Sequence, residues 1–190
     1  MDDDPQAVVD YWLDEVGPDG WYAGGEALDG VIRDRWGTLW TRAHGGGLDH
    51  WVAGPLPVLA YMIVTDQFPR NIHRGGPLAF ATDARARAAA RRAVAEGWDM
   101  AVPEPERQFM YLPFEHSEDP EDQALSVRLF AERLPGSPDN LIHARAHEAV
   151  IGRFGRFPFR NAALGRASTA EEAAWLAEGG YMALVRQMGG

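Results

Sequence analysis

Three stretches of the sequence concentrate side chains that can bind an anion or move a proton. Two of them, "DQFPRNIHRG" (66–75) and "RFPFRNAALGR" (156–166), each contain Phe-Pro, then Arg-Asn, and another arginine a few residues on. Guanidinium groups bind carboxylate or phosphate through paired hydrogen bonds, and asparagine adds an orienting donor and acceptor. The third stretch, "PFEHSEDPED" (113–122), places a histidine among carboxylates, a composition typical of general acid–base groups.

The repeated Arg-Asn pair predicts an anion-binding cleft in which the two segments form two walls. Because proline lacks a backbone N–H and blocks helix continuation, we expect Pro69 and Pro158 at turns between helices. The expected substrate-binding side chains are Asp66, Arg70, Asn71, Arg74, Arg156, Arg160, Asn161 and Arg166. The alternative is that each arginine pairs with a nearby carboxylate and brackets two helices, while the asparagines are turn residues.

The acid–base side of this cleft is expected in the third stretch. The macrodipole of a following helix explains Glu121 and Asp122 in its first turn, but it does not explain the charged residues that precede the helix. We expect His116 to be the acid–base group, tuned by the carboxylates on either side of it. The expected catalytic residues are Glu115, His116, Glu118 and, in support, His147. The alternative is that the two glutamates are counter-ions of the arginines.

A metal site is the next possibility, because His143 and His147 are four residues apart on one helical face. That spacing could ligate a metal together with Glu115 or Glu118. The segment "HARAH" lacks the glutamate of the zinc-hydrolase signature, and no carboxylate spacing supports a metal. We therefore predict neither a metal nor another cofactor, and we expect these histidines to be core or hydrogen-bonded residues.

Composition excludes several classes of function. The chain has 190 residues, no cysteine, a net charge of −10, and only arginine among its basic residues. Thiol and lysine chemistry are therefore excluded, and nucleic acid or an anionic membrane is not expected as a partner. The N-terminal "MDDDPQAVVDYW" resembles no signal peptide, and the longest apolar run is too short to span a membrane, so a cytoplasmic location is expected.

Apolar residues recur at helical spacing along the chain, and sustained strand alternation is absent. This pattern predicts an all-α array of about seven or eight antiparallel helices joined by short turns, in a single domain over residues 1–190. The helices are expected at residues 5–16, 26–43, 57–68, 82–96, 104–111, 119–134, 137–154 and 168–179. Asp119 is the expected N-cap of one helix, and Ser168 is the expected start of the last through a capping box.

A family resemblance rests on these same stretches. "DQFPRNIHRG", the residues Ala79, Phe80 and Asp83, "FMYLPFEHSED" and "RFGRFPFRNAALGR" together resemble the bacterial family filed as domain of unknown function 924. The resemblance extends from "VVDYWL" to "EEAAWL" and implies a tetratricopeptide-like superhelical fold, but no established activity. The family usually has histidine where this chain has Phe159. If that histidine is catalytic elsewhere, this chain has lost the activity or uses His116 or His147 instead.

Two functions follow as hypotheses. The first is an enzyme of hydrolase or lyase type that acts on a small anionic metabolite in the arginine-lined cleft. The second is a non-enzymatic module that grips a peptide or protein partner, as superhelical helix arrays commonly do. The concentration of polar side chains in three compact motifs favours the enzyme. A purely structural role of the polar residues is the third interpretation.

Overall fold

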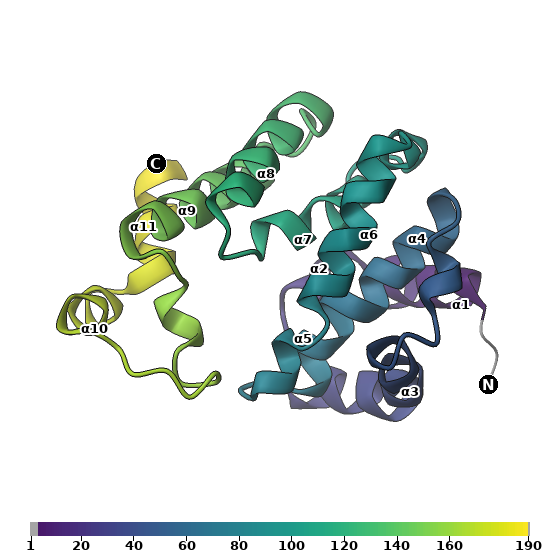
Figure 1. Cartoon of the computed structure of the whole chain (residues 1–190), viewed down its shortest axis with the longest axis horizontal. Helices are drawn as coiled ribbons and strands as arrows, with labels where there is room; N and C mark the ends of the chain where they lie inside the picture. The colour runs from purple at the N-terminus through teal and green to yellow at the C-terminus, as the bar shows by residue number, and fades with distance from the viewer. Residues whose placement is uncertain (1–3, 190) are drawn as a thin grey trace. The chain divides into compact units, whose positions relative to one another are not determined.

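The computed structural model describes residues 4–189, and this part of the chain contains helices and no strand (Figure 1). The all-α prediction is therefore confirmed. The chain divides into two compact units, Met1–Pro113 (unit 1) and Phe114–Gly190 (unit 2). The single domain over 1–190 and the tetratricopeptide-like superhelix stay predictions. Residues 1–3, which belong to the stretch used for the signal-peptide argument, and residue 190 lie outside the described residues.

Two of the helices expected in unit 1 lie close to their expected bounds. The predicted helix 26–43 ends one residue later than expected, and the predicted helix 82–96 lies within one residue of its expected bounds. The α-helices of unit 1 are α1 (Pro5–Asp10), α2 (Gly17–Trp21), α3 (Glu26–His44), α4 (Pro55–Met62), α5 (Phe68–Ile72) and α6 (Asp83–Ala95). Its other helical segments are π-helical at Tyr11–Val16 and Ile63–Gln67, and 3-10 helical at Asp49–Trp51, Pro77–Phe80, Trp98–Ala101 and Glu106–Met110.

The position of Pro69 differs from the prediction. It lies in the first turn of α5, directly after a π-helical segment, and not at a turn between helices. In the π-helical segment the N–H of Phe68 bonds to the carbonyl oxygen of Ile63, five residues back. Proline has no N–H to donate, and its fixed backbone conformation is tolerated in the first turn of a helix. Arg70 and Asn71 are consequently on a helix.

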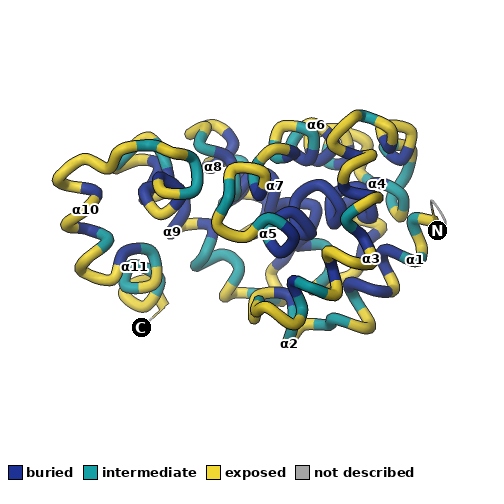
Figure 2. The backbone as a smooth tube through the Cα atoms, turned by 90° about the horizontal axis from the view of Figure 1, so that it is seen from below, coloured by how far each residue is buried: buried dark blue, intermediate teal, exposed yellow. Residues whose placement is uncertain are grey.

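Aromatic side chains from three elements form the core of unit 1. Trp12 and Phe68 are fully buried, with ring centroids 5.7 Å apart, and Trp12 also lies 6.0 Å from Phe109. Edge-on aromatic pairs of this kind add to the free energy gained by burial. Figure 2 shows the buried residues concentrated along α4 and α5. The polar residues Arg70 and Asn71 lie on the same helix as Phe68, directly after this apolar centre.

Unit 2 begins within α7 (Leu112–Glu115). It continues with α8 (Pro120–Arg133), α9 (Pro138–Phe154), a 3-10 turn (Pro158–Arg160), α10 (Ala170–Ala177) and α11 (Gly180–Gly189). Helices α8 and α9 form a hairpin and lie side by side (Figure 1). The buried centre of this unit consists of Val150, Ile151, Phe157 and Trp175. Pro158 begins the 3-10 turn that links α9 to the segment before α10, as expected of a turn residue.

Two details of unit 2 test the expected helix ends. Asp119 is the N-cap of α8 as predicted, and it accepts a hydrogen bond from the N–H of Glu121 at 2.8 Å. The capping box of α10 is formed by Thr169 and Glu172, one residue later than the pair beginning at Ser168. The sequence "STAEE" allows a capping box that begins at either Ser168 or Thr169, and the structure has the one that begins at Thr169.

Within residues 4–189, no helix has the length and apolarity required to cross a membrane.

Candidate functional site

The first Arg-Asn segment lies in unit 1 and makes its contacts there. Arg74 binds Asp29 of α3 through two hydrogen bonds of 2.6 and 2.8 Å, and Asn71 donates to the same carboxylate at 2.8 Å. Hydrogen bonds from Arg74 and Asn71 stabilise the charged form of this buried carboxylate and lower the pKa of Asp29, although burial opposes the shift. These contacts tie α5 and the residues that follow it to α3.

Arg70 of α5 contacts a different helix, α6, and the segment before it. Its guanidinium lies 2.8 Å from Asp83, the first residue of α6, and 3.6 Å from the buried Asp66. It also donates to the carbonyl oxygen of Ala79 and lies over the ring of Phe80. The first segment thus has the arrangement of the bracket alternative, with its polar groups joining three helices. Substrate binding by Asp66, Arg70, Asn71 and Arg74 stays a prediction.

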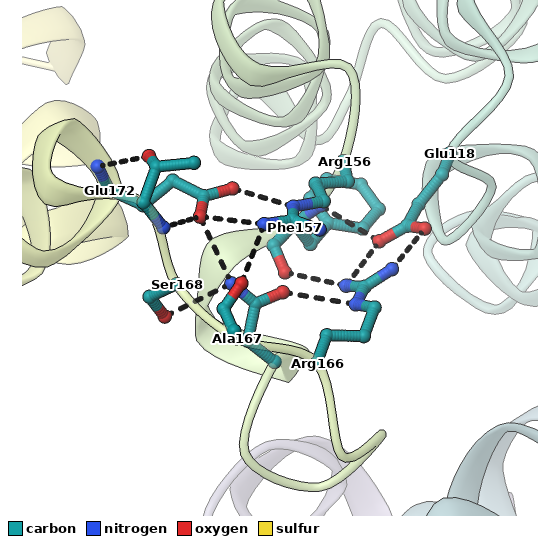
Figure 3. A network of polar contacts seen from close by, with 9 residues as sticks. Glu118, Arg156, Phe157, Arg166, Ala167, Ser168 and Glu172 are labelled. Atoms are coloured by element: carbon teal, nitrogen blue, oxygen red, sulfur yellow. Dashed lines mark hydrogen bonds and ion pairs between the residues drawn. The ribbon is translucent and has the colours of Figure 1, made fainter.

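The second Arg-Asn segment forms a polar network within unit 2 (Figure 3). Arg166 binds Glu118 through hydrogen bonds of 2.7 and 2.9 Å, and it donates to Asn161 at 3.0 Å. Asn161 in turn lies 3.3 Å from Glu172, which accepts two hydrogen bonds of 2.6 and 2.8 Å from Arg156. The network therefore runs without a break from the start of α8 to the start of α10.

The carboxylates of this network are held in their charged form. Burial alone would raise the pKa of Glu118, but hydrogen bonds from Arg166 and from the N–H of Phe157 outweigh it and lower the pKa. Arg156, the backbone N–H of Thr169 and Asn161 lower the pKa of Glu172 to about 2. Glu118 was expected beside a catalytic histidine, and the structure places it as the counter-ion of Arg166. Its catalytic role stays a prediction.

The network fixes the position of Phe157. The backbone N–H of Phe157 donates to Glu118 at 2.8 Å, and its carbonyl oxygen accepts from Arg166 at 3.1 Å. The ring is fully buried and lies 5.3 Å from the ring of His147. Arg160 places its guanidinium 4.4 Å above the same ring and donates to the carbonyl oxygen of His116 at 2.9 Å. The second segment is therefore connected to the predicted acid–base residues.

His147 lies next to two of the other predicted catalytic residues, Glu115 and His116. It lies on α9, is 9% exposed, and has its Nδ1 atom 3.1 Å from Oε1 of Glu115. Glu115 is 4% exposed, and its second oxygen has no hydrogen-bond partner among the described residues. The ring of His116 lies 6.4 Å from that of His147. The structure thus pairs Glu115 with His147 and places His116 beside them.

The neighbours of Nδ1 determine which nitrogen of His147 carries the proton. Besides Glu115, the carbonyl oxygen of His143 lies 3.0 Å from this atom. Both oxygens are acceptors, so they stabilise an N–H on Nδ1 and would repel a lone pair there. In the neutral ring Nε2 is then the nitrogen with the lone pair. A carboxylate that orients an imidazole in this way is the arrangement used by histidine bases.

Tyr181 of α11 belongs to this cluster, and sequence reasoning missed it. Its hydroxyl lies 2.6 Å from Nδ1 of His143 and 3.1 Å from Nδ1 of His147. The expected last helix ended at Gly179-Gly180, so the residues beyond were assigned to no element. The apolar residues of "YMALV" were the available signal for a further helix.

Phe159 occupies the position where the resemblance led us to expect histidine. Its ring stacks on Phe157 at 5.2 Å and lies 6.4 Å from His147 and 5.8 Å from Tyr181. It is 41% exposed, unlike the rings it contacts. The substituted position is therefore next to the predicted catalytic histidine, where it provides an apolar surface. No group of three or more histidine, aspartate or glutamate side chains within residues 4–189 is arranged to hold a metal ion.

Comparison with known proteins agrees with the motifs. The family model described as a bacterial protein of unknown function, DUF924, matches residues 8–180. The chain belongs to this family. The match extends over most of both units of this DUF924 protein and includes every predicted site residue.

A solved structure supports the fold of this DUF924 chain. It is titled as a protein of unknown function, ATU0120, from Agrobacterium tumefaciens, and its sequence is 40% identical. The similarity covers 92% of this chain and 97% of the other, with a TM-score of 0.86. No curated protein matches the DUF924 chain. The function must therefore be argued from the site itself.

Proposed function

We propose that this protein is an enzyme of hydrolase or lyase type, that it acts on a small metabolite bearing a carboxylate or phosphate, and that its acid–base site lies in unit 2. The observation that carries the proposal is the pair of His147 and Glu115, two buried titratable side chains 3.1 Å apart. A carboxylate that orients an imidazole is the arrangement used by histidine general bases. A cytoplasmic location belongs to the same proposal.

His147 would be the base and, after accepting a proton, the acid. Its Nε2 lone pair is the basic atom, because Nδ1 is directed at the oxygens of Glu115 and His143. When Nε2 takes a proton from a water or a substrate C–H or O–H, the ring becomes positively charged. Glu115 stabilises that charge without moving, as an orienting carboxylate does in other histidine-based sites. This assigns to His147 the part first expected of His116, which would assist from 6.4 Å away.

Arg160 is the candidate for binding the anionic group. It belongs to the same segment as Phe157 and Phe159, the two rings that contact His147. A guanidinium has five N–H donors in a planar fork, the geometry that binds a carboxylate or a phosphate. One of these donors bonds to the carbonyl oxygen of His116. Arg156 and Arg166 each bind a carboxylate of the network, and in this proposal they hold the segment in place.

Thermal melting against a panel of phosphorylated and carboxylated metabolites tests this proposal. A ligand present at about a hundred times its dissociation constant stabilises the folded state by about 2.7 kcal/mol, which raises the melting temperature by roughly 5 to 10 °C for a chain of this size. We expect a selective shift that is lost in Arg160→Ala. The matched control is Arg153→Ala, because Arg153 forms an exposed ion pair with Glu171 in the same unit.

One result would count against the enzyme, and two others against the role of Arg160. A flat panel with a single stoichiometric protein recovered in a pull-down would favour the peptide-binding alternative. A shift that persists in Arg160→Ala would remove the anion role from that residue. If Arg160→Ala is unfolded by circular dichroism while Arg153→Ala is folded, Arg160 is a structural bracket.

A further inference from the structure

The hydroxyl of Tyr181 bridges two histidines of α9. It lies 2.6 Å from Nδ1 of His143 and 3.1 Å from Nδ1 of His147. Since both ring nitrogens can either donate or accept, a hydroxyl that donates to one ring and accepts from the other can do so in two directions. In one, the hydroxyl donates to His143 and accepts from His147. In the other, it donates to His147 and accepts from His143.

The surroundings of His147 distinguish the two directions. If the hydroxyl donated to His147, Nδ1 of that ring would carry a lone pair. This lone pair would face Oε1 of Glu115 at 3.1 Å and the carbonyl oxygen of His143 at 3.0 Å. Two oxygens without protons beside an unprotonated nitrogen repel it, and burial leaves little water to screen the repulsion. The first direction places an N–H among three acceptors and avoids this cost.

We propose that Tyr181 is a positioning residue that fixes the tautomers of both histidines, donating its proton to Nδ1 of His143 and accepting from the N–H on Nδ1 of His147. His143 then carries its proton on Nε2 and His147 carries its own on Nδ1. The role in turnover rests on the proposed function, whereas the tautomers are a property of the protein alone. Tyr181 acts through His147.

The packing of α11 on α9 maintains this bridge. The ring of Tyr181 lies 4.6 Å from that of His147 and 5.9 Å from that of His143. It is partly buried and packs against the apolar centre of unit 2, with Leu176 and Leu184 as fellow members. The ring contacts depend on the aromatic carbons, so phenylalanine preserves them. Tyr181→Phe therefore removes the hydroxyl with little other change.

Two-bond proton–nitrogen correlation spectra of the full chain, labelled with ¹⁵N-histidine, test the inference without any substrate. Spectra of His143→Gln and His147→Gln assign the two rings, at a pH where the rings are neutral. In the wild-type protein we expect Nε2–H for His143 and Nδ1–H for His147. In Tyr181→Phe the Nδ1 signal of His143 should move downfield, toward that of an imine nitrogen without a donor. His147 should keep its proton on Nδ1.

The inference is overturned if His143 carries its proton on Nδ1 in the wild-type protein. It is also overturned if Tyr181→Phe leaves the nitrogen signals of His143 unchanged. The control is Tyr22→Phe, which removes a hydroxyl bound to Gln108 in unit 1 and should alter neither ring. If the variant does not fold, the wild-type spectrum alone decides in which direction the hydrogen bonds between His147, Tyr181 and His143 run. If the spectra show the expected tautomers but the protein turns over no metabolite, the proposed enzyme is refuted, while the assignment of the two tautomers to Tyr181 stands.

Discussion

Replacing Glu118 by glutamine should destabilise the protein, because Glu118 anchors the segment that presents Phe157 to His147. Its carboxylate accepts two hydrogen bonds from Arg166, at 2.7 and 2.9 Å, and one from the N–H of Phe157 at 2.8 Å. Glutamine keeps the shape and can still accept through one oxygen. It loses the charge, and it turns an amide N–H₂ toward a guanidinium that can only donate.

The magnitude follows from this loss. A hydrogen bond to a charged group contributes about 1.5 to 3 kcal/mol. The side chains of Glu118 and Arg166 are 29% and 24% exposed, so solvent screening reduces the effect. We expect a loss of about 1 to 2 kcal/mol in the free energy of unfolding. For a chain of this size that corresponds to roughly 2 to 8 °C in the melting temperature.

Urea denaturation followed by circular dichroism measures the loss. The matched control is Glu171→Gln, since Glu171 pairs with Arg153 in the same unit but both side chains are more than half exposed. An exposed pair contributes at most about 1 kcal/mol and commonly nothing measurable. A double-mutant cycle with Arg166→Gln should show coupling for Glu118. Equal and small losses in the two variants, or no coupling to Arg166, would refute the reasoning.

Further predictions concern unit 1 and the dependence on pH. Asp29→Asn should cost about 1 to 3 kcal/mol in urea denaturation, because the buried carboxylate accepts from both Arg74 and Asn71, whereas the exposed Asp34→Asn on the same helix should be neutral. Because the pKa of Glu172 is lowered to about 2 in the folded protein, the unfolded state binds more protons below pH 4.5; stability should fall from pH 4.5 toward pH 2, and less steeply in Glu172→Gln. Burial, with nearby positive charges, lowers the pKa of His73, so stability should also decline as the pH falls below about 6.5, and a His73→Gln protein that declines equally would contradict this.

Much of the fold could be predicted because helix ends carry local signals. Pro138 and Gly155 delimit α9 as the sequence indicates, with Gly155 in the left-handed conformation that ends a helix. The continuity from α4 to α5 could not be read in this way, because proline usually marks a boundary. It depends on a π-helical segment before Pro69, which tertiary packing stabilises and no residue type signals. The division into two units likewise has no linker composition to reveal it.

The site shows a similar limit. Residue types and spacing singled out Glu115 and His147, which the structure brings to 3.1 Å. The partner of each arginine could not be predicted, because it depends on how helices distant in sequence pack. Glu118 and Arg166 are 48 residues apart and form two hydrogen bonds. Tyr181 carried no motif, and only the packing of α11 on α9 identifies its role.

The most direct test of the proposed acid–base site is a comparison of metabolite consumption by three proteins. A pool of small carboxylated and phosphorylated metabolites is incubated with the wild-type chain, with His147→Gln, and with His50→Gln, whose histidine is exposed in unit 1. Mass spectrometry then follows every compound. We predict that the wild-type and His50→Gln proteins consume the same compound and that His147→Gln does not. Consumption by His147→Gln at the wild-type rate, or no consumption by any protein, would contradict the proposed site.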